Sequence, residues 1–312
     1  MTALDGITRP IVITGASGWI GSALLAHIAR AGGLGWSDQI RLFGQNARQY
    51  HAPDGTEFEI RALDTIDSID IEGAIVIHLA YLTKEKVETL GERVFTDTNL
   101  TIDDQMLRAF DRARPHAVFI ASSGAAALAE QGIDRHPYGM CKLRQEDRFL
   151  AWSAKSGVPL VAGRIFNLAG PHINKIESYA IGSFILQANA KSVINIEAQM
   201  PIFRSFLHVD DLCAMILGAA HHGIGYQAPI DLCGAEVLEM GDIAAMTATL
   251  YSKHVAVSRA QLRTEVANAY LGNFVQTKCL ALKLGLDLVP FRSQLTDTIS
   301  WLSDHSDAVQ HH

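Results

Sequence analysis

A tyrosine and a lysine with helical spacing are the residues in this chain best suited to proton transfer. Tyr138 and Lys142 are four positions apart, so on a helix both side chains project from one face. A neighbouring ammonium group favours the phenolate and lowers the pKa of the phenol toward neutrality. Such a pair is a general acid and base for interconverting a carbonyl and an alcohol. The spacing alone is common, and a solvated helical pair is the alternative interpretation.

Two serines follow an apolar run upstream of this pair. Residues 118–121 read as a buried strand, which ends in Ser122 and Ser123. In parallel α/β folds, ligands bind at the carboxyl ends of the strands. A serine hydroxyl at this position can therefore hold a substrate oxygen. The alternative for Ser122 is a hydrogen bond to the backbone at the strand end.

A glycine-rich turn near the N-terminus predicts a dinucleotide site. The segment 14–21 reads G-x-x-G-x-x-G between an apolar run and an amphipathic segment, the arrangement of a strand, a tight turn and a helix. Gly15 permits the turn, Gly18 lets the backbone approach the phosphates, and Gly21 lets the helix pack closely on the strand. A plain loop is the alternative.

The glycine turn, the strand-end serine and Tyr-x-x-x-Lys, in that order along the chain, resemble the extended short-chain dehydrogenases/reductases, also called the NAD-dependent epimerase/dehydratase family. Further segments carry the resemblance: His78–Ala80 (H-x-A), Asn99, Arg164–Pro171 (R-x-x-N-x-x-G-P), Arg204–Asp211 (R-D-F-x-H-V-D-D) and Leu284–Trp301 (L-G-W-x-P…L…W). The resemblance implies an α/β fold: a doubly wound parallel sheet of Rossmann type with a smaller C-terminal substrate lobe.

The resemblance also implies roles for individual residues. Ser123 holds the substrate oxygen, Tyr138 transfers the proton, and Lys142 tunes Tyr138 and binds the nicotinamide ribose. The cofactor-binding set carried over from the family is Gly15, Ser17, Gly18, Trp19, Ile20, Gly21, Gln45, Arg48, Asp64, Leu79, Ala80, Asn99, Ser122, Tyr138, Lys142 and Phe166. No metal site is expected.

The end of the second strand bears on the choice of cofactor. Gly44 stands where NAD-binding members usually carry an aspartate, and Arg48 is within reach of a 2′-phosphate. NAD(P) is therefore the expected cofactor, with NADP favoured over NAD. An ordinary surface arginine is the alternative for Arg48. Asp64 resembles the acid that accepts from the adenine amino group, with a surface turn residue as its alternative.

The residues after Ser123 limit the reaction type. In 4,6-dehydratases of the family these positions carry an acid/base pair, whereas here they are Gly124 and Ala125, which transfer no proton. Ala126 follows, so the cysteine acid/base that 3,5-epimerases use nearby is also missing. The expected function is hydride transfer at a sugar carbon, C4, by a 4-ketoreductase or 4-epimerase rather than a 4,6-dehydratase.

The substrate class follows from the second lobe. Asn167 resembles the family residue that contacts the sugar or its diphosphate, and Arg204 the arginine that pairs with the nucleotide phosphates. An ion pair with Asp210 or Asp211 is the alternative for Arg204. A nucleotide sugar is therefore the expected small-molecule substrate.

Three departures from the family pattern keep other functions open. Ser205 replaces the aspartate of R-D-F, and only Arg259 and Arg263 are loose candidates for a second nucleotide-binding arginine. Fourteen residues separate Ser123 from Tyr138, a short stretch for this family. One alternative is a dehydrogenase or reductase of a small non-nucleotide ketone or alcohol. The other is a non-catalytic NAD(P)-binding sensor, against which the intact Ser123, Tyr138 and Lys142 argue.

The elements that must position these residues alternate along the first half of the chain. Apolar runs separated by helical segments predict a parallel sheet covered on both faces. The expected strands are 11–14, 39–43, 57–61, 74–79, 117–121 and 160–164, and the expected helices 21–31, 85–113 and 138–156. Residues 1–171 are expected to be mainly the NAD(P)-binding domain. Residues 172–312 are expected to be mainly a substrate-binding lobe interleaved with the last strands of the sheet.

Composition excludes several classes of partner. The 312 residues carry a net charge of −7 with no basic run, which argues against nucleic acid and anionic membranes. The polar N-terminus predicts no signal peptide, and no apolar stretch reaches spanning length. The four cysteines are far apart, which favours reduced thiols in a cytoplasmic protein over a metal site.

The resemblance also implies a homodimer. In the family, the helix after the fourth strand and the Tyr-Lys helix form a four-helix interface between subunits. The corresponding segments here are 85–113 and 138–156. Met106, Phe110, Phe149 and Leu150 are candidates for its apolar contacts, with core positions as the alternative.

Overall fold

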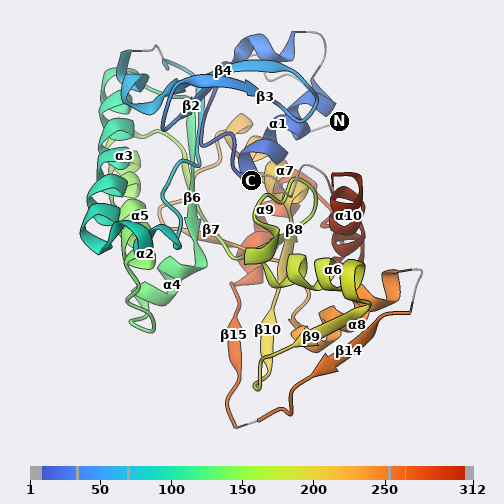
Figure 1. Ribbon diagram of the computed structural model, residues 1–312. Helices are drawn as coiled ribbons and strands as arrows, with labels where there is room; N and C mark the ends of the chain where they lie inside the picture. Colours follow the sequence, from blue (N-terminus) through green and yellow to red (C-terminus); the bar gives the residue numbers. More distant parts are fainter. Residues whose placement is uncertain (1–8, 33–34, 69–70, 252–253, 264, 306–312) are drawn as a thin grey trace.

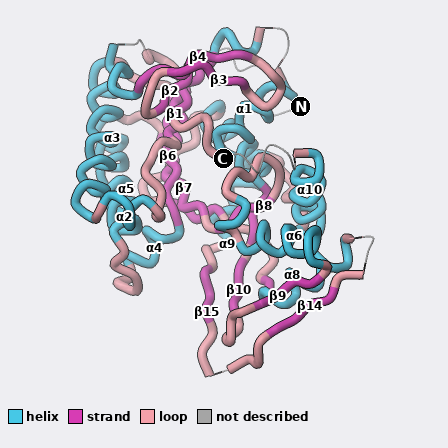
Figure 2. The backbone as a smooth tube through the Cα atoms, viewed as in Figure 1, coloured by secondary structure: helices cyan, strands magenta, loops and turns pink. Residues whose placement is uncertain are grey.

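A large twisted sheet forms the centre of the molecule (Figures 1 and 2). The computed structural model describes residues 9–32, 35–68, 71–251, 254–263 and 265–305, so the polar residues 1–8 lie outside the described part. Seven strands run parallel and the edge strand β3 is antiparallel. In sheet order the strands are β12 (Ile230–Leu232), β7 (Leu160–Ile165), β6 (Ala117–Ser123), β5 (Ile75–His78), β1 (Ile11–Thr14), β2 (Ile40–Gly44), β4 (Glu57–Ala62) and β3 (Arg48–His51).

Helices cover both faces of this sheet, which explains why its strands are continuous apolar runs. Every residue of β1 is buried: Ile11 and Ile13 belong to one hydrophobic core, and Val12 belongs to the other. The first core is shared with α1 (Trp19–Ala31) and α7 (Val209–His221), and the second with α3 (Glu92–Arg112) and α5 (Pro137–Ser156). The doubly wound α/β fold expected from the sequence is confirmed.

The expected long helix 85–113 is divided at one glycine. Gly91 has φ +76°, a left-handed conformation that a glycine adopts without strain, and it separates α2 (Lys86–Leu90) from α3. The strand β3 and the helix α4 (Gly124–Glu130) were not predicted. β3 escapes recognition because its side chains are polar and mostly exposed, with no apolar pattern.

Besides the large sheet, the described residues form three small sheets. Their strands are β13 (Leu238–Glu239), β10 (Ile202–Arg204) and β15 (Asn268–Tyr270); β14 (Ala256–Arg259) and β9 (Val193–Ile196); and β11 (Phe206–His208) and β8 (Asn167–Ala169). Strands β9, β10, β14 and β15 lie below the large sheet in Figure 1, and β8 lies beside it. The remaining elements are α6 (Ala180–Lys191), α8 (Met240–Leu250), α9 (Phe274–Leu284), α10 (Phe291–Asp304) and the short 3-10 turns η1 (Trp36–Gln39), η2 (Leu63–Ser68) and η3 (Ile176–Ser178). Within the described ranges, no helix has both the length and the apolar character needed to cross a membrane.

Three of the four apolar residues expected at a subunit interface belong to the interior instead, and the fourth, Leu150, is half-buried beside the same core. Met106, Phe110 and Phe149 are at most 3% exposed and pack in the core between the sheet and helices α3 and α5. Exposed apolar side chains on these two helices are Val94 and Met140. Periodicity could not separate the two sets because an apolar stripe on a helix marks burial of either kind.

Two glycines of the turn allow a test of which one the packing of the fold requires. A Cβ at Gly21 would lie 2.5 Å from the carbonyl oxygen of Ala16, whereas at Gly18 the nearest atom is at 3.4 Å, an ordinary contact. Gly21→Ala is therefore expected to destabilise the fold by about 1–3 kcal/mol, because backbone must move. Gly18→Ala is the matched control and should change the free energy of unfolding by no more than about 0.5 kcal/mol. Equal urea midpoints for the two variants would contradict this account.

Candidate active site

The glycine turn has the shape that a pyrophosphate requires. Gly15 has φ +76°, and a Cβ there would lie 2.8 Å from the backbone nitrogen of Ala80. Gly18 is the N-cap residue of α1 and supplies no side-chain cap, so no side chain there competes for the helix's first N–H groups. Free N–H groups and the helix dipole favour an anion at this point. The residues present therefore fit a dinucleotide.

Thr14 fixes the turn against the neighbouring strand end. Its Oγ1 accepts hydrogen bonds from the backbone N–H groups of Leu79 (3.2 Å) and Ala80 (3.1 Å) and lies 2.7 Å from Nδ1 of His78. His78 is buried, and this burial lowers its pKa to about 3, so the ring is neutral. The segments 14–21 and 78–80, expected to bind the cofactor, therefore lie side by side.

The residues expected near the adenosine end lie farther apart. Gln45 is exposed in the turn after β2, and Asp64 is exposed at the start of η2, after the adjacent strand β4. Arg48 is exposed on β3, which pairs with β4 and not with β2. Arg48 is thus separated from Gly44 by a whole strand, a position that sequence spacing alone did not reveal.

The two serines at the end of β6 point in opposite directions, as successive residues of a strand do. Ser122 is buried and donates its hydroxyl hydrogen to the Glu146 carboxylate. Ser123 is partly exposed, caps α4 by accepting from the N–H of Ala125 at 3.2 Å, and interacts with the hydroxyl of Tyr138. The structure thus brings together Ser123 and Tyr138, while the hydroxyl of Ser122 is used inside the protein.

A buried ion pair attaches α5 to the sheet below this site. Arg164 of β7 donates to Glu146 through Nε and Nη2, the latter at 2.7 Å, and through Nη1 to Glu130 of α4. The Glu146 side chain is 1% exposed. A buried charge left without its partner is strongly destabilising, so α5 has one stable position on the sheet.

Tyr138 and Lys142 project from the first turns of α5, but they do not share a hydrogen bond. Lys142 Nζ donates to the carbonyl of Ala121 (2.6 Å) and to Oε1 of Gln145 (2.9 Å), and it lies 3.6 Å from the centre of the Tyr81 ring. The expected lowering of the Tyr138 pKa is therefore wrong for this arrangement. Burial raises the pKa of Tyr138 to about 12, although its hydrogen bond with Ser123 acts in the opposite direction.

A buried aspartate supports the charge of Lys142, and the sequence analysis missed it. Asp103 of α3 is fully buried and accepts from Nε2 of Gln145 at 2.7 Å, so the glutamine amide bridges the carboxylate and the ammonium. Burial lowers the pKa of Lys142 to about 7, and the charges of Asp103 and Glu146 oppose this shift. The Asn99 side chain, in the same helix, accepts from the N–H of Leu82 at 2.9 Å.

Removing the charge of Asp103 should change the pH dependence of catalysis. In Asp103→Asn the pKa of Lys142 falls further, because the carboxylate charge that favours its ammonium form is gone, so less ammonium is present beneath the site at pH 7. The alcohol-oxidation rate at pH 7 should fall by up to about tenfold for each unit by which that pKa falls, and the basic limb of the profile, where Lys142 loses its proton, should move to lower pH. Asp104→Asn, at the exposed neighbouring position, is the control. Superimposable profiles for the two variants would rule out this role.

The substrate-lobe residues approach from β8 and β10. Asn167 donates through Nδ2 to the carbonyl of Ser205 at 3.2 Å. Arg204 donates through Nη1 to the carbonyls of Phe203 (2.8 Å) and Asn268 (3.5 Å). Among the described residues, no carboxylate pairs with Arg204. Its guanidinium group is therefore available to an anionic ligand.

The other arginine candidates differ from Arg204. Arg259 forms a two-point ion pair with Glu239, one bond of which measures 2.6 Å, so its charge is already neutralised. Arg263 is exposed, beyond the end of β14. Arg259 is therefore unavailable as a second nucleotide-binding arginine, whereas Arg263 stays a loose candidate.

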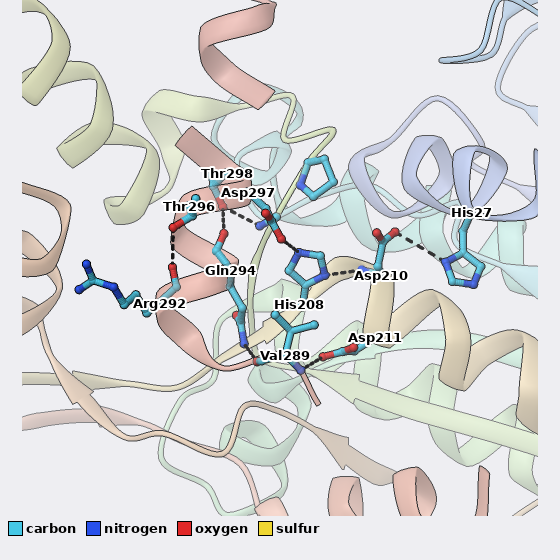
Figure 3. Close-up of polar contacts among 12 residues, drawn as sticks. His27, His208, Asp210, Asp211, Val289, Arg292, Gln294, Thr296, Asp297 and Thr298 are labelled. Carbon is cyan, nitrogen blue, oxygen red and sulfur yellow. Dashed lines mark hydrogen bonds and ion pairs between the residues drawn. The ribbon is translucent and has the colours of Figure 1, made fainter. Parts of the chain in front are cut away.

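The segment His208–Asp211 makes its polar contacts with α1, with the residues before α10 and with α10 (Figure 3). His208 caps α7 by accepting from the N–H of Asp210, and its Nε2 lies 3.3 Å from the Asp297 carboxylate. Asp211 accepts from the N–H of Val289 at 2.9 Å, and Asp210 pairs with Arg30 of α1 at 2.7 Å. The alternative ion pair of Arg204 with Asp210 or Asp211 is therefore wrong, because both carboxylates have other partners.

Asp210 gives this joint a measurable pH dependence. Burial alone would raise its pKa, but the hydrogen bond with His27 and the charge of Arg30 outweigh this and lower the pKa to about 2. Because the folded-state pKa is below the unfolded value, the stabilisation is present above about pH 4 and lost toward pH 2. Asp210→Asn should therefore cost about 1 kcal/mol of unfolding free energy at pH 7. That difference should shrink below pH 4 in urea titrations; a pH-independent difference would contradict the assignment.

A second tyrosine reaches the site from the smaller lobe, and no sequence motif indicated it. Tyr270 ends β15 opposite Arg204 of β10, and its hydroxyl lies beside Gly124 and interacts with Ser123. Its ring packs against Phe166, with 4.9 Å between the ring centroids. Nothing in the surrounding sequence distinguishes Tyr270 from a surface residue, so only the fold places it here.

Comparison with known proteins gives the class of enzyme. Residues 11–228 match the model of the NAD dependent epimerase/dehydratase family. The match spans more than two thirds of the chain, so the protein belongs to this family, and the resemblance inferred from the sequence is confirmed. It is accordingly an enzyme of the extended short-chain dehydrogenase/reductase type that uses NAD(P). A search of the curated proteins finds no match.

Solved structures share the fold at low sequence identity. A UDP-N-acetylglucosamine 4-epimerase from Methanobrevibacter ruminantium M1, in complex with UDP-N-acetylmuramic acid, has TM-score 0.74 and 17% identity over 95% of this chain and 99% of its own. DesIV, a dTDP-glucose 4,6-dehydratase from Streptomyces venezuelae bound to NAD and DAU, has TM-score 0.74 and 16% identity over 97% and 99%. RMD from Pseudomonas aeruginosa, complexed with NADPH, has TM-score 0.70 and 20% identity over 95% and 100%.

Proposed function

We propose that this protein catalyses NAD(P)-dependent hydride transfer at C4 of a nucleotide sugar, as a 4-ketoreductase or 4-epimerase. One observation carries the proposal: the Ser123 and Tyr138 hydroxyls come together at the end of β6, while the next two positions after Ser123, Gly124 and Ala125, hold no acid or base. A dehydratase needs such groups to eliminate water. The site is thus suited to proton transfer at one oxygen, without elimination.

The residues of the site divide the chemical work. Ser123 holds the reacting oxygen, and Tyr138, protonated at neutral pH, delivers a proton to that oxygen during ketone reduction. Lys142, held by Gln145 and Asp103, supplies positive charge beneath the site and stabilises the phenolate that remains. The glycine turn of 14–21 would hold the dinucleotide, which supplies the hydride chemistry when bound.

Substrate recognition is assigned to the smaller lobe. The forked guanidinium of Arg204, which has no carboxylate partner among the described residues, suits a diphosphate. Solved structures that share this fold include complexes with nucleotide sugars, such as MoeE5 in complex with UDP-glucose and NAD. We therefore propose a nucleotide sugar as the substrate class.

For the cofactor, NADP is favoured over NAD because no acid follows β2, where Gly44 ends the strand. The position of Arg48 on β3, one strand beyond β4, removes part of the support that spacing gave to this choice. The cytoplasm is the proposed location. We also propose a homodimer built on α3 and α5, with Val94 and Met140 among its apolar contacts, a state that light scattering measures directly.

Ligand binding tests the proposal most directly. The purified chain is titrated with NADH and NADPH by fluorescence, and UDP-, dTDP-, GDP- and CDP-sugars are screened by thermal shift. A shift with one nucleotide sugar, together with NADPH binding, supports a reductase, whereas NAD retained through purification supports an epimerase. Cofactor binding without a response to any nucleotide sugar would overturn the proposal in favour of a small-ketone dehydrogenase.

The catalytic step has its own test. Tyr138→Phe removes the proton donor and keeps the ring, so turnover should fall at least ~10²-fold while the dissociation constant for NADPH stays within about twofold. Ser123→Ala, which leaves Tyr138 in place, should lose less. Full biological function in Tyr138→Phe would instead indicate a non-catalytic sensor.

A further inference from the structure

Tyr270 connects the two ends of the proposed substrate site. It leaves the three-stranded sheet of the smaller lobe at the position opposite Arg204, and the guanidinium carbon of Arg204 lies 5.8 Å from the centre of its ring. The other end of the side chain reaches the large sheet, where the hydroxyl lies against Gly124 and interacts with Ser123 and with the backbone of Ala125. One side chain therefore spans from the anion-binding arginine to the catalytic serine.

Two glycines make room for this side chain and its aromatic neighbour. A Cβ at Gly124 would lie 2.5 Å from the Tyr270 hydroxyl and 2.5 Å from Cε1 of Phe166. A Cβ at Gly272 would lie 2.6 Å from Cε2 of the same Phe166 ring. Because even a methyl group is excluded at these positions, the Phe166–Tyr270 pair fits only beside glycines. The Tyr270 hydroxyl thus occupies the space over Gly124, where dehydratases of the family carry an acid.

The Tyr270 hydroxyl acts as a neutral hydrogen-bonding group and not as a base. Burial raises its pKa, although the hydrogen bond with Ser123 and the charge of Arg204 act in the opposite direction. At neutral pH it is therefore protonated and able to donate. Ser123 then stands between two phenols, Tyr138 from α5 and Tyr270 from β15.

We propose that Tyr270 is a substrate-positioning residue, whose hydroxyl at Ser123 and ring beside Arg204 align the reacting carbon of a substrate anchored by its phosphates. The inference rests on the proposed nucleotide-sugar function. It adds the residue that fixes where the reacting carbon lies relative to the phosphates bound by Arg204. Alignment of this kind lowers the barrier to reaction more than it strengthens binding. Loss of the hydroxyl should therefore affect kcat and leave the phosphate anchor intact.

The experiment separates the hydroxyl from the ring. Tyr270→Phe keeps the contacts with Phe166 and Arg204, so kcat for the nucleotide sugar found in the screen should fall about tenfold. The dissociation constant for UDP, or for the matching nucleoside diphosphate, should stay within about twofold by calorimetry. Tyr270→Leu also removes the ring and should additionally raise KM. Tyr226→Phe is the matched control, since Tyr226 lies under Lys283, away from the site.

The outcomes distinguish this inference from the function on which it rests. Wild-type kcat in Tyr270→Phe, with an active wild-type enzyme, would overturn the inference alone. A nucleotide affinity that falls together with kcat in Tyr270→Phe would also overturn it, because the residue would then serve binding or folding. Absence of nucleotide-sugar binding and turnover in the wild-type chain would overturn the proposed function and this inference with it.

Discussion

The position of helix α5 on the sheet is the constraint on which the active site depends. That position is held by the ion pair between Glu146 and Arg164, buried between α5 and β7, with Ser122 hydrogen-bonded to the same carboxylate. Taking two charges out of water is costly unless they meet in good geometry, so few other placements of α5 are accessible. Lys142 and Tyr138 lie about one and two helical turns before Glu146 on α5, so this ion pair also fixes their positions. Catalytic geometry is in this sense set by residues that touch no substrate.

The segment His208–Asp211 positions neighbouring helices through a small number of polar contacts. Asp210 binds α1, Asp211 binds the backbone before α10, and His208 caps α7 and faces Asp297 (Figure 3). Because these carboxylates are engaged there, Arg204 faces the site without a competing acid among the described residues. Most of the motif Arg204–Asp211, which resembled part of the substrate site, therefore has a structural role. Its first residue, Arg204, is left available to an anionic ligand.

Much of the fold could be predicted from the sequence because its signals are local. Buried parallel strands are short apolar runs, and the turn of Gly15–Gly21 needs residues without a Cβ; both features show directly in one sequence. The division of the long helix at Gly91 and the polar edge strand β3 were missed, since neither leaves an apolar pattern. Ser123 and Tyr138 were found through their motifs. Asp103 and Tyr270 were not, because each acts across a distance in sequence that only the folded chain closes.

The pair of aromatic rings over Gly124 limits the routes by which this enzyme can acquire a new reaction. An acid at position 124 has no space while Phe166 and Tyr270 stand where they do, and only a smaller or displaced ring would provide it. A proton-transferring side chain at this position therefore requires a second change at one of the two aromatic residues. The identity of residue 124 is in this way coupled to two residues that are distant from it in sequence.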